Sequence, residues 1–302
     1  MGRKTIIARA TQPRILWGAW SKVAAGSPRA GVDGVTVNQF AKGIDGEIQK
    51  LQQEIRDGSY TPNPVLVREV SIHRKIRHLG IPTVRDRLAQ RAVLDGAHAL
   101  FDSDLGEASF AYRRGRSWLC ALREAERSRD DGLRWVFRTD IHKFFDEIDH
   151  ATLELFLGRL LERQAEVDLV MSWVRADLVT AAGQRPNTVG IPQGAPISPA
   201  LANRYLQPFD QAINGERGRL VRYADDLAVF CASAEQAHLV AHDVERALDA
   251  LGLAPNPDKT YVSNFERGFS FLGWVFFGDD GYEEDPNDEW THPMSTGRPA
   301  RP

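Results

Sequence analysis

The sequence predicts an α+β fold in which helices pack on one face of a small antiparallel sheet. Residues 134–277 follow the order strand, helices, hairpin, helix, strand. Capped amphipathic stretches and short alternating apolar stretches follow one another along the chain, as expected for helices and strands. Apolar residues make up 42% of 302 residues, which suits a globular protein with a sizeable core.

The first part of the chain alternates helical and extended patterns. Thr36 is a good N-cap for a helix with regular apolar spacing, and Gly58 follows its end. Ser117 likewise can cap a helix after the loop at 109–117. The expected elements are a helix over 36–57, strands over 63–72 and 75–82 joined by a tight basic turn, and helices over 84–101 and 118–129.

The second part begins with a strand that ends near Asp140. Ser198 and Pro199 make a good helix start, and Ser233 with Gln236 forms a capping box for a helix that stops at Gly252. The expected elements are a strand over 134–141, helices over 151–164 and 167–179, a helix from 198, a hairpin over 220–231, a helix from 233, and extended segments over 253–262 and 269–277.

Composition excludes several classes. The net charge of −3 favours no particular partner, but seven acidic residues follow Gly278, so residues 278–302 predict an acidic, disordered tail. Cys120 and Cys231 lie far apart, which indicates neither a disulfide framework nor a zinc site. No apolar run approaches the length of a membrane span. We therefore expect a cytoplasmic protein that has no membrane partner.

Arginine residues gather in two stretches, Arg68–Arg91 and Arg113–Arg116. Such clusters are typical of nucleic-acid contacts, although a solvated surface is the simpler interpretation.

Asp225 and Asp226 stand side by side between two apolar strands. An Asp-rich turn is one explanation, because Asp favours turns. A metal site is the other: if the strand that ends in Asp140 lies beside this hairpin, three carboxylates converge at one sheet edge. Mg²⁺ prefers oxygen ligands, and two ions about 4 Å apart stabilise both the attacking and the leaving oxygen in phosphoryl transfer.

The sequence resembles the reverse transcriptase family over residues 31–277. The motifs that carry the resemblance follow the family's order: AGVDGVT at 30–36, LGIPTVRDRLAQRAV at 79–93, FAYRRGRS at 110–117, FRTDIHKFFDEIDH at 137–150, GIPQGAPISPALAN at 190–203, YADD at 223–226, LAPNPDKT at 253–260 and FSFLGW at 269–274. Their wording is closest to group II intron-like bacterial enzymes, and FAYRRGRS resembles CRISPR-associated reverse transcriptases.

The resemblance implies a right-hand polymerase: an N-terminal segment (1–30), fingers with part of the palm (31–133), and a palm with the catalytic motifs (134–277). The family normally continues into a helical thumb, whereas this chain ends soon after the FLG motif. We expect a thumb that is absent or severely truncated. Binding of the primer–template duplex should then be weak and sensitive to salt. A partner protein or structured RNA would complete the channel that holds the duplex.

The resemblance also implies site residues. Asp140, Asp225 and Asp226 would bind two Mg²⁺ ions, with a backbone group of Ile141 beside the triphosphate. Phe145 stands at the position of a steric gate that favours deoxynucleotides, although core packing would also explain an aromatic residue there. Lys259 matches the lysine that protonates the leaving pyrophosphate, although a lysine after a turn is usually only solvated.

Further residues are implied for the nucleotide and the primer. Gln193 and Gly194 would contact the incoming nucleotide, and Phe271, Leu272 and Gly273 would form the primer grip. Arg77 with Arg74 or Lys75 would hold the triphosphate. The chain departs from the family here, because His73 replaces an expected proline and the turn is about three residues shorter, so the cation that takes the lysine position stays open.

The expected function is an RNA-directed DNA polymerase of a CRISPR, defence or mobile-element system, which uses an RNA template, a DNA or RNA primer and dNTPs. A CRISPR integrase is one candidate partner. The alternative is a maturase-like or defence RNA-binding protein in which polymerisation is secondary. An RNA-dependent RNA polymerase is disfavoured by Phe145.

Overall fold

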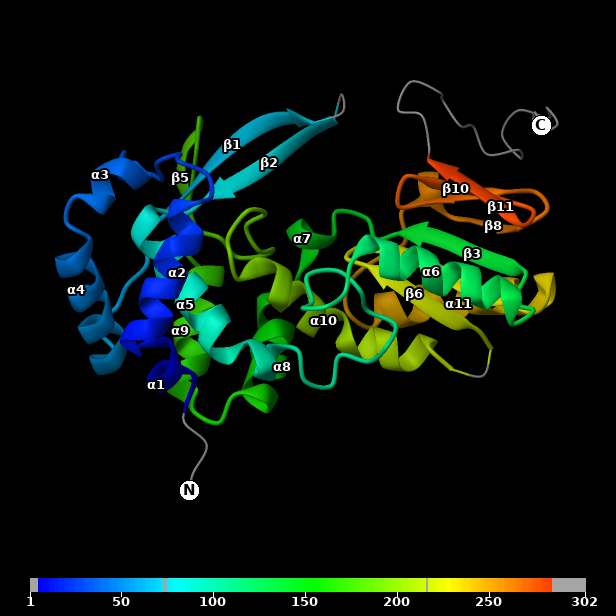
Figure 1. Cartoon of the computed structure of the whole chain (residues 1–302), viewed down its shortest axis with the longest axis horizontal. Helices are drawn as coiled ribbons and strands as arrows, with labels where there is room; N and C mark the ends of the chain where they lie inside the picture. Colours follow the sequence, from blue (N-terminus) through cyan, green and yellow to red (C-terminus); the bar gives the residue numbers. More distant parts are fainter. Residues whose placement is uncertain (1–4, 73–74, 216, 284–302) are drawn as a thin grey trace. The chain divides into compact units, whose positions relative to one another are not determined.

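The computed structural model describes residues 5–72, 75–215 and 217–283 (Figure 1). The chain forms two compact units, and each is built from two separate segments. The first unit comprises Met1–Ser103 and Phe145–Tyr205, and the second comprises Asp104–Phe144 and Leu206–Pro302. Both contain helices and a mainly antiparallel sheet, which confirms the α+β class. The expected boundary between residues 133 and 134 does not coincide with this division.

The first unit combines a helical group with a four-stranded sheet in the order β2-β1-β4-β5. β1 pairs antiparallel with β2 and parallel with β4. Its elements are α1 (Ile6–Ala10), α2 (Pro13–Ala24), α3 (Val37–Ala41), α4 (Ile44–Asp57), β1 (Val65–Ile72), β2 (Lys75–Ile81), α5 (Val84–Phe101), α8 (His150–Leu160), α9 (Gln164–Val174), β4 (Leu178–Thr180) and β5 (Gly183–Arg185). The helices α7 (Phe144–Glu147) and α10 (Ser198–Ile213) contain residues of both units.

Three local features of this unit differ from the sequence expectation. The single helix expected over 36–57 is interrupted at Gly43, so α3 and α4 form instead. The helix expected over 167–179 ends at Val174, because the Asn187 side chain donates to the Val174 carbonyl oxygen at 2.7 Å and the chain then turns into β4. Within 1–30, the helix α2 was not expected, although it buries Leu16, Ala19 and Val23 at helical spacing.

The second unit is built on a four-stranded antiparallel sheet in the order β6-β7-β3-β8. A second, three-stranded antiparallel sheet has the order β11-β10-β9. The elements are α6 (Trp118–Asp130), β3 (Trp135–Asp140), β6 (Arg219–Tyr223), β7 (Asp226–Cys231), α11 (Ala234–Asp249), a short 3-10 helix (Pro257–Lys259), β8 (Tyr261–Asn264), β9 (Phe269–Phe271), β10 (Trp274–Phe277) and β11 (Asp280–Glu283).

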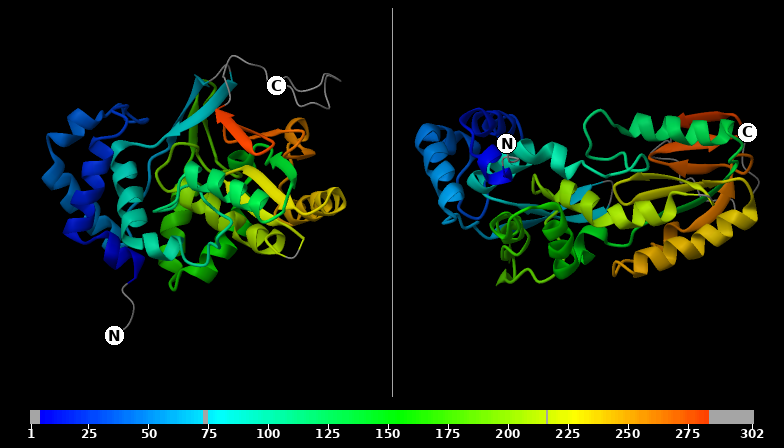
Figure 2. Two further views of the ribbon diagram at one scale, coloured as in Figure 1. Left: turned by 45° about the vertical axis from the view of Figure 1, so that its right-hand side comes forward. Right: turned by 90° about the horizontal axis from the view of Figure 1, so that it is seen from below.

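Helices cover both faces of the four-stranded sheet, so the expectation of helices on one face is wrong. Figure 2 shows α6 and α11 on opposite sides of these strands. The residue pattern agrees: Val136 and Phe230 pack in one cluster with Leu122 of α6, whereas Phe137 and Val229 alternate with them along the strands. β7 is accordingly apolar from Leu227 to Cys231, which is the pattern of a strand buried on both faces.

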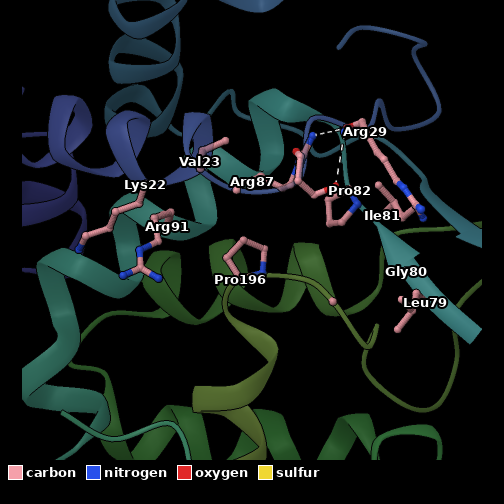
Figure 3. A pocket seen from close by; sticks show the side chains of 13 residues that line it. Lys22, Val23, Arg29, Leu79, Gly80, Ile81, Pro82, Arg87, Arg91 and Pro196 are labelled. Atoms are coloured by element: carbon pink, nitrogen blue, oxygen red, sulfur yellow. Dashed lines mark hydrogen bonds between the residues drawn. The ribbon is translucent and has the colours of Figure 1, made fainter. Parts of the chain in front are cut away.

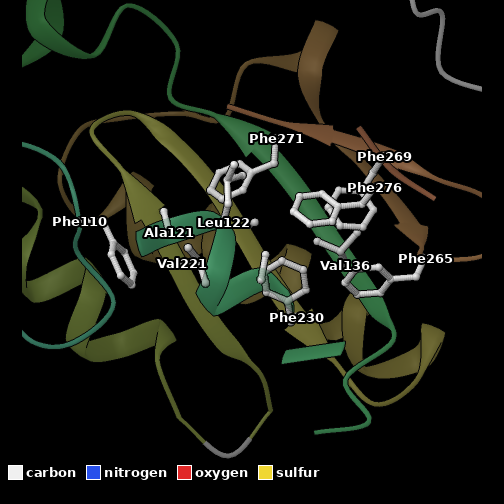
Figure 4. Packing of buried hydrophobic residues seen from close by; sticks show 12 residues of the cluster. Phe110, Ala121, Leu122, Val136, Val221, Phe230, Phe265, Phe269, Phe271 and Phe276 are labelled. Carbon is white, nitrogen blue, oxygen red and sulfur yellow. The ribbon is translucent and has the colours of Figure 1, made fainter. Parts of the chain in front are cut away.

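The core between α6 and the two sheets is rich in phenylalanine (Figure 4). Phe269 and Phe276 stack with ring centroids 5.0 Å apart, and Phe265 meets Phe269 edge to face at 5.1 Å. The strand β11 extends this sheet into the stretch expected to be a disordered tail, so that expectation is wrong for Asp280–Glu283. Residues 284–302 lie outside the described part of the chain. None of the helices described is both long and apolar enough to cross a membrane.

Candidate active site

The three aspartates lie together at one end of the β6-β7-β3 strands. Asp140, the last residue of β3, is the direct antiparallel partner of Asp226, the first residue of β7. The Ile141 amide continues the ladder and donates to the Asp225 carbonyl oxygen at 2.9 Å. The strand register therefore brings together carboxylates from two distant segments of the sequence.

Ala224 and Asp225 form the two-residue turn of the hairpin, since Tyr223 pairs with Asp226. Ala224 has a φ of 59°, a left-handed conformation that favours glycine. A positive φ at the first central residue is the pattern of a type II′ hairpin turn, in which glycine is preferred. The backbone beside the carboxylates is therefore strained.

A buried arginine supports this turn from below. Arg222 is fully buried, and its Nε donates to Asp210 Oδ1 at 2.6 Å. Its other nitrogens donate to Ser109 Oγ at 2.9 Å and to the Ala224 carbonyl oxygen at 3.1 Å. A buried ion pair is stable only when its remaining donors are also satisfied, and this arginine meets that requirement. Arg222 thereby links the β6 strand to the strained residue of the turn.

A lysine side chain contacts the carboxylate of Asp140. The Lys259 Nζ lies 2.6 Å from Asp140 Oδ2, at the end of the short 3-10 helix. Asn256, which caps that helix, donates its amide to the Asp140 carbonyl oxygen at 2.7 Å. The NPDK segment is thus fixed against the end of β3 by backbone hydrogen bonding.

Asp226 is held by Arg138, which lies two residues before Asp140 on β3. An Arg138 Nη is 2.8 Å from Asp226 Oδ1, and the Arg138 Nε donates to the Ser270 carbonyl oxygen at 2.9 Å. The guanidinium also lies 4.5 Å above the centre of the Phe271 ring. Because these contacts involve three elements, Arg138 connects the carboxylates to the β9 strand.

The electrostatics of the site are unfavourable for Asp225. Burial, followed by the negative charges of Asp140 and Asp226, raises the pKa of Asp225 to about 6. Lys259 only partly offsets these effects. The Asp225 carboxylate therefore carries its charge at neutral pH against an energetic cost.

The donor set fits a hard divalent cation that binds together with a phosphate substrate. Such a cation would neutralise the repulsion on Asp225, and Mg²⁺ usually takes only one or two carboxylates plus phosphate oxygens. Lys259 and Arg138 already bind the other two carboxylates. Among the residues that the structure describes, no group of three or more acidic, histidine or cysteine side chains is already arranged to hold a metal ion.

Two of the family-like motifs meet within the first unit. The Gly80 amide donates to the Gln193 carbonyl oxygen at 2.7 Å. Gly194 has a φ of 111°, and a Cβ there would lie 2.8 Å from the Gly80 carbonyl oxygen. A Cβ on Gly80 would lie 2.7 Å from the Pro192 Cβ. Both glycines are therefore required for the close approach of the LGIP and PQG segments.

The backbone of Phe145 is also hydrogen-bonded to the PQG segment. The Ile191 amide donates to the Phe145 carbonyl oxygen at 2.8 Å. Gly190 has a φ of 80°, and a Cβ there would lie 2.7 Å from the Asp146 carbonyl oxygen. Its own carbonyl oxygen lies 2.7 Å from His150 Nε2. The start of α7 and the loop before α10 thus form one rigid substructure in the first unit.

The predicted phosphate-binding cations belong to β2. Arg77 pairs with Val70 in the β1–β2 hairpin and is exposed. Lys75 begins β2, whereas His73 and Arg74 lie outside the described residues. These residues, with Phe145, Gln193 and Gly194, belong to the first unit, and the aspartates and Lys259 belong to the second.

The predicted primer-grip residues comprise Phe271 at the end of β9 and the two residues of the turn between β9 and β10. Phe271 is fully buried in the phenylalanine-rich core. Leu272 and Gly273 both have positive φ values, 55° and 74°, the pattern of a type I′ turn. Leu272 is therefore strained in the same way as Ala224.

Sequence reasoning missed Arg138, Arg222, Asp210 and Asn256. The local sequence contained a signal for Arg138 and for Asn256. Arg138 precedes Asp140 by two residues on a strand and so shares its face, and Asn256 is a capping residue just before Pro257. The partnership of Arg222 with Asp210 joins a strand to a helix, and nothing in the local sequence indicates it.

The sequence is similar to those of several known proteins. The chain is 29% identical to Protein YkfC of Escherichia coli over 290 residues, which cover 82% of this chain and 76% of that protein. It is 32% identical over 169 residues to the group II intron-encoded protein LtrA of Lactococcus lactis, a match that covers 55% of this chain and 28% of LtrA.

Solved structures give the same fold. A chain of a partial Cas6-RT-Cas1–Cas2 complex matches with a TM-score of 0.51 and 26% identity, over 82% of this chain and 42% of that chain. Telomerase from Candida albicans matches with a TM-score of 0.57 at 12% identity, over 84% of this chain and 51% of that chain, which shows the fold alone. The chain thus spans about half or less of these structural relatives.

A family model described as reverse transcriptase (RNA-dependent DNA polymerase) matches residues 67–276, which include all the aspartates described above. The matched segment covers more than half of the chain and includes parts of both compact units. This chain therefore belongs to the reverse transcriptase family, whose members are RNA-directed DNA polymerases and hence nucleotidyltransferases.

Proposed function

We propose that this chain extends the 3′-OH of a primer with deoxynucleotides on an RNA template by two-metal phosphoryl transfer. The observation that carries the proposal is the direct pairing of Asp140 with Asp226, with Asp225 in the adjoining turn. Family membership supports the same reaction. No side chain of the site needs to form a covalent intermediate, because catalysis of phosphoryl transfer depends on positioning and charge neutralisation.

In this proposal, Asp140, Asp225 and Asp226 hold two Mg²⁺ ions. When bound, such ions neutralise charge on the attacking and leaving oxygens. The Ile141 amide is bound to the Asp225 carbonyl oxygen, so the role proposed for Ile141 falls to its carbonyl oxygen. Arg138 keeps its hydrogen bonds to backbone oxygens and orients Asp226 from the side of β9.

Lys259 has two roles in the proposal. Before substrate binds, its ammonium neutralises Asp140. It then transfers a proton to the leaving pyrophosphate, which requires that it exchange Asp140 for a phosphate oxygen. Lys259 is about half exposed, so its side chain has the freedom for this exchange.

The remaining roles concern substrate placement. Phe145 is proposed as the steric gate against the 2′-hydroxyl, and Gln193 and Gly194 as contacts for the incoming nucleotide. Arg77, with Arg74 or Lys75, would bind the triphosphate through charge-assisted hydrogen bonds. The turn of Phe271, Leu272 and Gly273 would hold the primer end. The backbone at both positions supports these roles, because Gly194 has no room for a Cβ beside Gly80 and Leu272 is held in a strained left-handed conformation.

The proposed partners are an RNA template, a DNA or RNA primer and dNTPs. A CRISPR context with a Cas1-type integrase is supported by the match to the Cas6-RT-Cas1–Cas2 complex. A group II intron context is supported by the match to LtrA. Of the arginine-rich stretches, Arg68, Arg77 and Arg114 are exposed, and these would contact nucleic-acid phosphates in either case.

Primer extension by the purified chain tests the proposal. A labelled DNA primer on an RNA template, with dNTPs and Mg²⁺, should be extended by the wild type and not by Asp225→Asn. Asp249→Asn removes an equivalent charge from an exposed position of α11 and should extend normally. Equal extension by wild type and Asp225→Asn would contradict the proposal.

The second candidate is an RNA-binding role with secondary polymerisation, which the match to an intron-encoded protein favours. Gel-shift titration of structured RNA separates the two functions. If Asp225→Asn abolishes both primer extension and the cellular function of the protein, polymerisation is the biological activity. If cellular function and RNA affinity both survive this substitution, the RNA-binding role is the correct one.

A further inference from the structure

The helix α11 carries two histidines, His238 and His242, that lie one turn apart. Both histidines are exposed. Because residues four apart are neighbours on a helix surface, with Cβ atoms about 6 Å apart, the two imidazoles lie side by side in solvent. The helix packs on β3, β7 and β8 through other residues, namely Ala237, Val240, Val244 and Leu248.

The two imidazoles have no partner within residues 5–72, 75–215 and 217–283. His238 and His242 form no hydrogen bond, ion pair or ring contact there. The other histidines in these ranges interact with the rest of the protein: His78, His98, His142 and His150. The ring nitrogens of the pair are therefore open to a ligand from solution.

Two clusters of charged side chains elsewhere differ from this pair, because protein groups already compensate their charges. Lys22 and Arg91, which line a cavity of the first unit, both bind Asp95, at 2.8 and 3.1 Å (Figure 3). On α11 itself, Asp243 binds two arginines, each at 2.5 Å. The histidine pair has no such compensation from a described side chain.

Two glutamates flank the pair along α11. Glu235 lies three residues before His238, and Glu245 lies three residues after His242, so each is one turn from an imidazole. Both are exposed, and neither forms an ion pair with a described residue. Their negative charges favour a cation beside the histidines. In the part of the chain that the structure describes, no third ligand side chain is already in place there, so the two imidazoles are the core of the site.

We propose that His238 and His242 together bind one divalent transition-metal ion of the class that imidazole favours, namely Zn²⁺, Ni²⁺ or Cu²⁺. Each imidazole supplies one nitrogen at about 2 Å from the ion, and histidines four apart on a helix reach one ion together. Water, or the carboxylate of Glu235 or Glu245, fills the remaining positions.

This site is separate from the proposed polymerase site. None of the residues assigned to the reaction belongs to α11, and the nitrogen donors differ from the oxygen donors that Mg²⁺ takes. Binding requires the helix, because the unfolded chain does not hold the two imidazoles at this spacing. The ion therefore stabilises the folded chain by mass action.

Isothermal titration calorimetry with Ni²⁺ tests the proposal on the full chain without a polyhistidine tag, in excess Mg²⁺ to compete for the aspartates. The variants are His238→Ala and His242→Ala, both at exposed positions. The matched control is His242→Ala/Ala250→His, which keeps the number of histidines but moves the second imidazole to the exposed C-cap, about 18 Å along the helix axis from His238. His78→Ala, on β2, removes an exposed histidine outside the pair. Circular dichroism checks that each variant is folded.

We expect both single variants of the pair and the spacing control to bind Ni²⁺ about tenfold or more weakly than the wild type, and His78→Ala to bind it equally. Ni²⁺ should also raise the thermal unfolding temperature of the wild type and not that of the spacing control. Wild-type affinity in either single variant would overturn the proposal. Equal affinity of the spacing control and the wild type would do the same, because binding would then not depend on the pair.

Discussion

The Lys259 ammonium lies 2.6 Å from Asp140 Oδ2, so the predicted proton donor contacts a predicted metal ligand. A cation bound to Asp140 competes with this ammonium. We therefore expect Lys259→Gln to bind Mn²⁺ several-fold more tightly than the wild type, as measured by electron paramagnetic resonance titration. Primer extension should fall about 100-fold, because the proposed proton donor is lost. Lys50→Gln, at an exposed position of α4, serves as control. Unchanged extension by Lys259→Gln would exclude the proton-donor role.

Asp225 limits the stability of the metal-free protein. Its pKa of about 6 lies above the usual 3.8, so ionisation costs stability as pH rises from about 4 through 6. Asp225→Asn should therefore be more stable than wild type by about 1 kcal/mol at pH 7.5, and this advantage should fade towards pH 4. Thermal unfolding in EDTA at several pH values measures this difference in stability, with Asp249→Asn as the reference variant. A destabilised Asp225→Asn at pH 7.5 would refute the electrostatic account.

Arg222 should be the most sensitive position beneath the catalytic turn. Its removal leaves Asp210 buried without a partner and frees the Ala224 carbonyl oxygen. Arg222→Ala should lower the free energy of unfolding by about 3 kcal/mol or more, measured by urea denaturation. Arg267→Ala, at an exposed site in the same unit, should change it by less than about 0.5 kcal/mol. Similar midpoints for the two variants would show that the buried pair is not structural.

Gly190 and Gly158 make a matched pair of glycine substitutions. Gly190 has a positive φ, and an added Cβ meets backbone oxygens, whereas the space around Gly158 in α8 is open. We expect Gly190→Ala to destabilise the protein by about 2 kcal/mol or more and Gly158→Ala to stabilise it by up to about 1 kcal/mol. Denaturation midpoints test this contrast. Tolerance of alanine at Gly190 would show that its conformation is not required.

Phe145 is predicted to select the sugar of the nucleotide. Phe145→Ala should extend primers with ribonucleotides far more readily, while it keeps deoxynucleotide extension. The ratio of kcat/KM for dATP to that for ATP is the measurement, and we expect it to fall at least tenfold. Phe144, which is buried next to it, provides the control as Phe144→Leu. An unchanged ratio in Phe145→Ala would assign Phe145 to core packing instead.

Much of the fold followed from local rules. Thr36, Ser117 and Ser233 cap helices as predicted, because an N-cap side chain accepts a hydrogen bond from an amide within the same turn. The break at Gly43, the early end of α9 and the strand β11 were not predicted. The strand β11 forms by pairing with its neighbour β10, and the chain after α9 is held by the hydrogen bond from the Asn187 side chain to the Val174 carbonyl oxygen.

The sequence by itself determined the family, the order of the motifs, and the choice of Asp140, Asp225 and Asp226, since these depend on residue types at fixed spacings. Tertiary structure alone decided that β3 pairs with β7 in the register that joins Asp140 to Asp226. It also decided that Lys259, Arg138 and Arg222 hold the carboxylates and their turn. The physical reason is that these pairings join segments far apart in the sequence, and the residues of one segment do not specify which other segment packs beside it.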